Sequence, residues 1–239
     1  LPEEHDYRSG INVCKDFPAY ERACSILERF HGSVFTNNLS GSTINHPPMN
    51  IQPTKEFLGC KPRRMNADKQ AFLDIWLDRK LKAGIIEPCN GDPSNTTMPT
   101  SPLILVKKPP PSVDPYRVTL DAAEVNKCMP KIKMETPITR ECLQKLGGHK
   151  YYWKADMCDY FFQFEVSPEM ANLYAFSTHR GIFRFKKILP QGDQNSPPWT
   201  TNAMQHILIP IREEVSNYVD DFAGGDDEPE ILCDKLERF

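Results

Sequence analysis

The 239-residue chain is predicted to adopt an α+β fold, and three observations support this prediction. Helical patterns are mixed with short strand-like segments, most of which lack regular alternation, as expected where helices and strands form separate layers. Proline is enriched, at 22 residues, which favours loops and fixed turns over a helical bundle. Hydrophobic residues make up 39% of the chain and charged residues 26%, which allows a packed core and argues against global disorder.

Residues 1–60 are predicted to be an N-terminal linker that contains one helix. The segment Tyr20–Phe35 has the spacing of an amphipathic helix. The apolar positions that would share one face are Ala23, Ile26, Leu27 and Phe30. The following segment, Asn37–Pro53, is rich in Asn, Ser, Thr, Gly and Pro and is predicted to be a loop.

A long helix is predicted from Asn66, as N-cap, through Ala83, with Gly84 ending it. Its apolar face would consist of Phe72, Leu73, Trp76, Leu77 and Leu81. A strand is predicted at 102–106 and a returning strand at Tyr116–Leu120. The two lysines and the proline run between these strands indicate a hairpin tip.

The second half of the chain is predicted to supply further strands and one helix. Tyr151–Val166 and Leu173–Ile188 are rich in aromatic and other β-forming residues. Pro197–Ile211 is predicted to be a helix that proline opens at its first turn. Val215–Phe222 is predicted to be a short strand and turn.

Composition limits the kinds of partner. The formal net charge is -3, so any nucleic-acid contact must come from local basic patches, whereas a carboxylate metal site could offset a basic channel. The eight cysteines are scattered without a CxxC pair, which favours reduced thiols in an intracellular protein. No segment approaches the roughly 18 apolar residues of a membrane span. The chain starts at Leu1 without an initiator Met, and we expect it to be part of a longer protein.

Two adjacent carboxylates, Asp220 and Asp221, follow Tyr218 and Val219 in a short, apolar-flanked segment. Such a pair is costly unless it is solvated or meets cations. Taken alone, the pair is more typical of a surface turn than of a site. The nearby pair Asp226-Asp227 is predicted to be an exposed turn of this kind, after Gly224-Gly225.

Asp156 lies within an aromatic-rich segment and would need a partner there. If the two segments lie side by side, Asp156 and Asp220 could hold two divalent cations that activate a hydroxyl and stabilise a departing pyrophosphate. Mg²⁺ suits such a site because it takes few carboxylates and completes its shell with phosphates. Between the segments, Gly192 permits a close backbone approach and Gln191 offers an amide.

The order of these segments resembles the reverse transcriptases of retroviruses and gypsy-type LTR retrotransposons. The three central matches are Asp156 with an aromatic residue five positions later, LPQG followed by NSP at 189–197, and YVDD at 218–221. The flanking matches are Lys80–Pro88 (KLKAGIIEP), Ser101–Lys108 (SPLILVKK), Arg117 with Asp121 and Asn126, Leu146–Tyr152 (LGGHKYY), Val166–Glu169 (VSPE) and Phe176–Phe185 (FSTHRGIFRF). The collinear resemblance covers roughly residues 62 to 238.

The resemblance implies the fingers and palm of a right-hand polymerase, with an antiparallel palm sheet backed by helices. It places the fingers at 61–133 and 164–196 and the palm at 134–163 and 197–239. The thumb and RNase H regions of the family are expected to lie outside the chain.

The resemblance also implies a two-metal nucleotidyltransferase, an RNA-directed DNA polymerase that adds dNTPs to a primer 3′-hydroxyl. It assigns Asp156 and Asp220 as ligands of Mg²⁺ or Mn²⁺, with Asp221 as the third carboxylate. The backbone carbonyl of Met157 is the further ligand that it implies.

The resemblance also implies which residues bind the incoming nucleotide. Phe161 matches the aromatic gate that excludes a 2′-hydroxyl, with a core phenylalanine as the alternative. Gln191 and Gly192 match the dNTP-binding turn.

Arg117, with Lys107 or Lys108, matches the finger residues that grip the triphosphate, because cationic groups make strong phosphate contacts. The choice between the two lysines stays open, and solvated loop charges are the alternative for both.

The implied setting is a retrotransposon polyprotein that acts on RNA or DNA template-primer, without a membrane, in cytoplasmic virus-like particles and in the nucleus. Two other functions remain open. One is a truncated, inactive relic that at most binds nucleic acid. The other is an RNA-dependent RNA polymerase, which Phe161 and Val219 disfavour because that class typically has GDD and no bulky gate.

Overall fold

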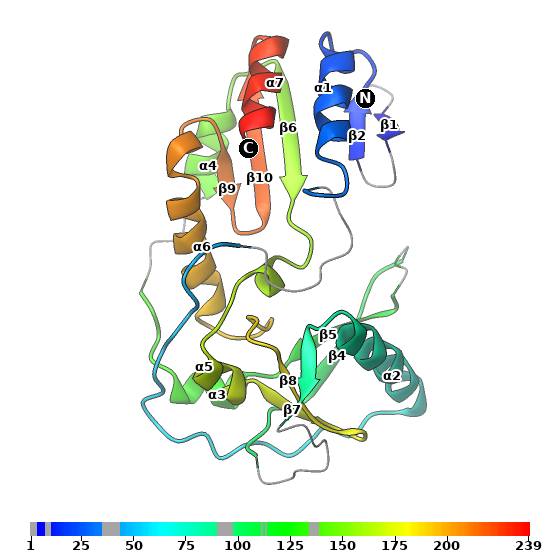
Figure 1. The fold of residues 1–239 in the computed structure, drawn as a ribbon, viewed down its shortest axis with the longest axis vertical. Helices are drawn as coiled ribbons and strands as arrows, with labels where there is room; N and C mark the ends of the chain where they lie inside the picture. Colours follow the sequence, from blue (N-terminus) through cyan, green and yellow to red (C-terminus); the bar gives the residue numbers. More distant parts are fainter. Residues whose placement is uncertain are drawn as a thin grey trace. The chain divides into compact units, whose positions relative to one another are not determined.

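The chain divides into two compact units in the computed structural model (Figure 1). Unit 1 contains Leu1–Asn38, Glu135–Cys158 and Thr201–Phe239, and unit 2 contains Leu39–Met134 and Asp159–Thr200. The residues that the structure describes are 4–7, 11–34, 44–89, 98–110, 112, 114–133 and 139–239. Within these residues, none of the helices has both the length and the apolar character needed to span a bilayer.

Unit 1 is built on a three-stranded antiparallel sheet (Figure 1). Its strand order is β6-β10-β9. The strands are β6 (Tyr151–Asp156), β9 (Ser216–Tyr218) and β10 (Asp221–Asp226), and the helices that contact them are α4 (Thr139–Leu146) and α7 (Pro229–Arg238). An antiparallel sheet with helices packed against it confirms the predicted α+β class.

The N-terminal residues of unit 1 form a hairpin and a helix. The hairpin pairs β1 (Glu4–Tyr7) with β2 (Ile11–Cys14), and α1 (Tyr20–Arg29) follows it. Sequence reasoning predicted the helix but not the hairpin. The helix ends at Arg29 rather than continuing to residue 35, which lies outside the described residues, as do positions 37–43 of the predicted loop.

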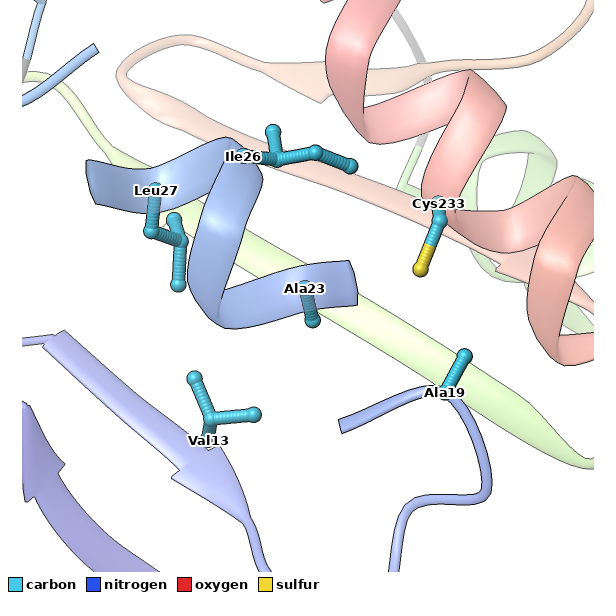
Figure 2. Packing of buried hydrophobic residues seen from close by; sticks show 6 residues of the cluster. All are labelled: Val13, Ala19, Ala23, Ile26, Leu27 and Cys233. Carbon is cyan, nitrogen blue, oxygen red and sulfur yellow. The ribbon is translucent and has the colours of Figure 1, made fainter. Parts of the chain in front are cut away.

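Helix α1 packs against α7 through a small apolar cluster (Figure 2). The cluster consists of Val13, Ala19, Ala23, Ile26, Leu27 and Cys233. Arg22 pairs with Glu230 at 2.6 Å and with Asp234, and Arg29 pairs with Glu237 at 2.5 Å. The ion pairs at the edge of the apolar contact help to fix α1 on α7.

Gly224, Gly225 and Asp226 lie within β10, so the predicted exposed turn is wrong for Asp226, whereas Asp227 is exposed in the bend that follows the strand. The β6–β10 pairing continues to Asp226, which forms an ion pair with Lys235 of α7 at 2.8 Å instead of lying in an exposed turn. Gly224 is required beneath Trp153, because a Cβ added there would lie 2.5 Å from the indole Nε1. The Trp153 ring in turn packs 4.7 Å from Phe239.

We expect Gly224→Ala to lower the free energy of unfolding by about 1–3 kcal/mol, the usual cost of overpacking a core. The new methyl group must displace a buried indole that also packs against Phe239. Urea unfolding of the parent, Gly224→Ala, Trp153→Leu and the double variant gives the measurement. The double variant should be more stable than the sum of the two single effects predicts. Strict additivity would show that Trp153 is not the residue that Gly224 accommodates.

Unit 2 contains a β-hairpin, a three-stranded sheet and several helices (Figure 1). The hairpin pairs β4 (Leu103–Lys107) with β5 (Tyr116–Leu120). The antiparallel sheet has the order β3 (Ile86–Pro88), β8 (Gly181–Phe185) and β7 (Ala175–Thr178). The helices are α2 (Ala67–Lys82), α3 (Ala123–Cys128) and α5 (Pro168–Leu173), with the 3-10 helix η2 (Tyr160–Gln163). The predicted hairpin tip includes positions 111 and 113, which lie outside the described residues.

The observed ends of two further segments can be compared with the predicted ones. Helix α6 (Ser196–Ile207) and the 3-10 helix η3 (Ile209–Ile211) correspond to the helix predicted at 197–211. The aromatic stretch predicted as a strand from Tyr151 is a strand only to Asp156. Asp159 then has φ 47°, a left-handed conformation that ends extended structure and leads into η2.

Candidate active site

Strands β9 and β10 are joined by a tight turn that carries Asp220. Tyr218 pairs with Asp221 in the register, so Val219 and Asp220 form the turn. Val219 has φ 58°, a left-handed conformation that is unfavourable for a β-branched side chain. The Asn217 side chain donates a hydrogen bond to the Val219 carbonyl at 3.0 Å. The strained turn is therefore held by its own strand.

The structure brings three carboxylates together at this turn. Asp156, the last residue of β6, lies directly opposite Asp221 of β10. Directly opposed residues in an antiparallel pair project from the same face of the sheet, with Cβ atoms about 4.5–5.5 Å apart. The backbone N–H of Met157 donates to the Asp220 carbonyl at 3.0 Å, which ties the end of β6 to the turn.

The carboxylates are only partly compensated by positive charge. Desolvation raises the pKa of Asp156, and the charges of Asp220 and Asp221 raise it further. Lys154 opposes this shift and forms an ion pair with Asp221, Nζ to Oδ1, at 2.9 Å.

This arrangement fits a divalent cation that needs few protein ligands. Across the described residues, no three His, Cys, Asp or Glu side chains are arranged so that they could hold one ion. Mg²⁺ does not need three, because it is commonly held by one or two carboxylates plus water and substrate phosphates. Asp156 and Asp220 match that requirement, since Asp221 already has Lys154 as its counterion.

The predicted phosphate-binding residues lie on the β4–β5 hairpin of unit 2. Arg117 lies opposite Val106 in the register. Because side chains alternate between the faces of a strand, Lys108 falls on the same face as Arg117 and Lys107 on the other. The Lys108 backbone N–H continues the ladder by donating to Pro115 at 3.0 Å. The register therefore associates Lys108, rather than Lys107, with Arg117.

The Gln191–Gly192 turn lies against the end of β5. Gly192 has φ +118°, and a Cβ there would lie 2.3 Å from the Leu120 carbonyl oxygen and 3.7 Å from Thr119 Cγ2. Only glycine permits this approach. Thr119 is two residues from Arg117 and therefore on the same strand face. Within unit 2, the predicted dNTP-binding turn therefore lies against the strand that carries Arg117.

Phe161 differs from the aromatic residues around it. Tyr160, Phe162 and Phe164 are 3%, 7% and 1% exposed, whereas Phe161 is only half-buried. Its ring lies edge-on to Tyr160 at 5.3 Å. The Leu189 N–H donates to the Phe164 carbonyl at 3.1 Å, which links this segment to the one that precedes Gln191. Phe161 is therefore less buried than its aromatic neighbours and does not belong to the buried core of unit 2.

Sequence reasoning missed two features of these sites. Lys154 shares a strand face with Asp156 by two-residue spacing, and that spacing was the available signal. The second feature is a set of amide side chains beside Gly192, from Asn126, Gln194 and Asn195. Asn126 and Asn195 lie in segments that carry the resemblance, but their contacts could not be predicted because their partners come from distant parts of the chain.

Comparison with known proteins identifies relatives over most of the chain. Residues 105–238 match the sequence model of a family described as "Reverse transcriptase (RNA-dependent DNA polymerase)". The Pro-Pol polyprotein of simian foamy virus type 1 is 27% identical over 209 residues, covering 87% of this chain and 16% of that polyprotein. The Gag-Pol polyprotein of feline leukemia virus is 33% identical over 191 residues, covering 75% of this chain and 10% of the polyprotein. The chain therefore spans less than a fifth of these relatives.

Solved structures show the same fold. A foamy viral protease–reverse transcriptase in complex with double-stranded DNA has a TM-score of 0.78 at 22% identity, covering 92% of this chain and 37% of that chain. The native protease–reverse transcriptase of prototype foamy virus has a TM-score of 0.71 at 26% identity, covering 91% and 29%. With a family match over more than half of its residues, the chain belongs to the reverse transcriptase (RNA-dependent DNA polymerase) family.

Proposed function

We propose that this chain supplies the catalytic part of an RNA-directed DNA polymerase. The reaction would be attack of a primer 3′-hydroxyl on the α-phosphate of a dNTP, directed by an RNA or DNA template. The observation that carries the proposal is the pairing of Asp156 with Asp221, beside a turn that holds Asp220. The family match supports the same reaction.

Asp156 and Asp220, with the backbone carbonyl of Met157, would hold Mg²⁺ or Mn²⁺. Two such ions, when bound, lower the pKa of the attacking hydroxyl and neutralise charge on the departing pyrophosphate. The protein contributes a rigid frame, since Met157 is hydrogen-bonded to the turn and Asn217 fixes Val219. Lys154 would keep Asp221 neutralised and so limit the repulsion among the carboxylates.

The nucleotide would be bound by unit 2. Arg117 and Lys108 are the proposed triphosphate contacts, since they share one hairpin face. Lys107 faces the other way and is the weaker assignment. Gln191 and Gly192 would offer a backbone surface and an amide to the nucleotide, and Phe161 would lie under its sugar.

We further propose that residues 1–60 are an N-terminal linker, that the palm (134–163 and 197–239) lies mostly in unit 1 and that the fingers (61–133 and 164–196) lie in unit 2. The chain would belong to a polyprotein of a gypsy-type LTR element. The retrovirus-related Pol polyprotein from transposon 297 of Drosophila melanogaster supports a retrotransposon origin alongside the viral relatives. It is 29% identical over 143 residues, which cover 59% of this chain and 13% of that polyprotein. Foamy viral relatives solved with double-stranded DNA and with an RNA/DNA hybrid support template-primer as the partner. The thumb and RNase H regions would be further partners, and the site of action would be cytoplasmic virus-like particles and the nucleus.

Single-nucleotide addition to a primed RNA template tests the proposal, at low salt and with enzyme in excess so that processivity is not required. We expect incorporation of dNTPs that depends on Mg²⁺ or Mn²⁺ and is lost with EDTA. Absence of incorporation under all conditions would favour an inactive relic. Equal use of NTPs would favour an RNA polymerase.

A further inference from the structure

The predicted nucleotide-binding turn is held by a side chain from a separate helix. Asn126 lies in α3, and its side-chain amide spans the turn. Its Nδ2 donates to the Gly192 carbonyl at 3.2 Å, and its Oδ1 accepts from the Gln194 N–H at 3.1 Å. We propose that Asn126 is a positioning residue that fixes the Gln191–Gly192 turn for nucleotide binding. This inference rests on the proposed function of the turn.

Gln194 in turn donates hydrogen bonds to α3, so Asn126 and Gln194 are bonded to each other in both directions; we call this pair the clamp. Its Nε2 donates to the backbone carbonyl of Asn126 at 2.8 Å and to that of Met129 at 3.3 Å. The Asn126 carbonyl also accepts from the Met129 N–H at 3.3 Å, at the end of α3. Gln194 therefore adds a second donor to that carbonyl and contacts the residue that ends the helix. The short helix α3 is therefore joined to the turn by bonds in both directions.

A second pair of bonds anchors the chain just beyond the turn. Asn195 is fully buried, and its side chain donates to the Pro130 carbonyl at 3.0 Å and accepts from the Ile132 N–H at 2.9 Å. Asp193, 3% exposed, accepts from the Asn195 N–H at 3.0 Å and from the Ser196 hydroxyl at 3.2 Å. These bonds fix the start of α6, but none of them reaches Gly192.

Gly192 itself needs an external restraint. It has no side chain, and its φ is +118°. Because glycine can also adopt many other backbone conformations, this one is not fixed by the residue itself. The Gly192 carbonyl and the amide that follows it lie in one peptide plane, so a bond to that carbonyl sets the plane. Among the described residues, Asn126 is the side chain that makes this bond. Loss of Asn126 would release the turn while leaving the buried bonds of Asn195 intact.

The test measures dNTP dependence of single-nucleotide incorporation with saturating template-primer. For Asn126→Ala we expect the apparent KM for dNTP to rise about ten- to a hundredfold, by analogy with the effect of losing a residue that orients a metal ligand. The kcat should change by less than about threefold, since ground-state binding is what is lost. Thermal unfolding should show that the variant remains folded.

Two matched variants separate positioning from a general structural role. Asn126→Asp keeps an acceptor for the Gln194 N–H but loses the donor to Gly192, so it should behave like Asn126→Ala. Glu124→Ala lies in the same helix, removes only an exposed pair with Lys127, and should leave KM unchanged.

The positioning role would be overturned if Asn126→Ala had the parental KM for dNTP. It would also be overturned if the variant lost only kcat and stability. If Asn126→Asp kept the parental KM, the Gly192 bond would not be the one that matters. If the parent itself incorporated no nucleotide, the proposed function would fail first, and the nucleotide role of Asn126 would fall with it.

Discussion

Asp156→Asn should reduce nucleotide incorporation by on the order of a thousandfold, at least as much as losing one electrostatic stabiliser of a transition state. Asparagine keeps the shape of the side chain but removes the charge that would hold the cation. The measurement is the rate of single-nucleotide addition at saturating dNTP and Mg²⁺. Asp220→Asn should have an effect of the same order.

Asp227→Asn is the matched control, because Asp227 is an exposed acid that accepts from the Lys150 N–H at 3.0 Å, away from the three carboxylates. It should retain parental activity. Without metal, Asp156→Asn should be at least as stable as the parent, since desolvation, and then the neighbouring negative charges, raise the pKa of Asp156 and so penalise its ionised form. Parental incorporation by Asp156→Asn would remove the basis for the polymerase assignment.

Phe161→Val should allow ribonucleotide incorporation, with discrimination between dNTPs and NTPs falling by about 10–200-fold, the range of a small steric difference in a pocket. The ring is half-buried among fully buried neighbours, so its removal should open space without collapsing the core. Use of dNTPs should fall only modestly. Competition between dNTP and NTP at a single template position gives the ratio.

Phe161→Tyr retains the ring and should retain the parental discrimination. If the valine variant selected sugars as well as the parent does, Phe161 would be a packing residue and the gate would lie elsewhere. A loss of all incorporation in both variants would point to a folding role.

Elements specified by local chemistry could be predicted from the sequence. Helix α2 begins where Asn66 accepts a hydrogen bond from the Lys69 N–H at 3.1 Å, and Gly84 follows it with φ 68°. Both signals act within one turn of the helix, so no knowledge of the rest of the chain is needed. The predicted N-cap and terminating glycine are confirmed.

Elements specified by distant neighbours could not be predicted. The β1 strand has the sequence EHDY, without apolar alternation, so nothing local indicates a hairpin. A Gly-Gly-Asp-Asp sequence normally favours a turn. Here β6 pairs along the whole of β10, and Trp153 occupies the space that a side chain at Gly224 would need.

In the candidate site, too, some features could be predicted from the sequence and others depend on contacts between distant residues. The resemblance led us to expect Asp156, Asp220 and Asp221 to lie together, and they do, although their catalytic role stays a prediction. The choice of Lys108 required the strand register. The clamp between Asn126 and Gln194 joins residues 68 positions apart, which no pattern in a single sequence reveals.

The discontinuity of unit 1 has a consequence for how the protein is made. Its closing contacts join residues far apart in the chain, such as Arg22 and Glu230, separated by 208 positions. On the ribosome, α1 and β6 emerge long before β10 and α7, so unit 1 cannot complete its core until translation has passed Arg238. Unit 2 has all of its residues by Thr200 and can fold first. A nascent chain that stalls between these points would carry a finished unit 2 and an unpaired β6, whose open edge is a template for aggregation.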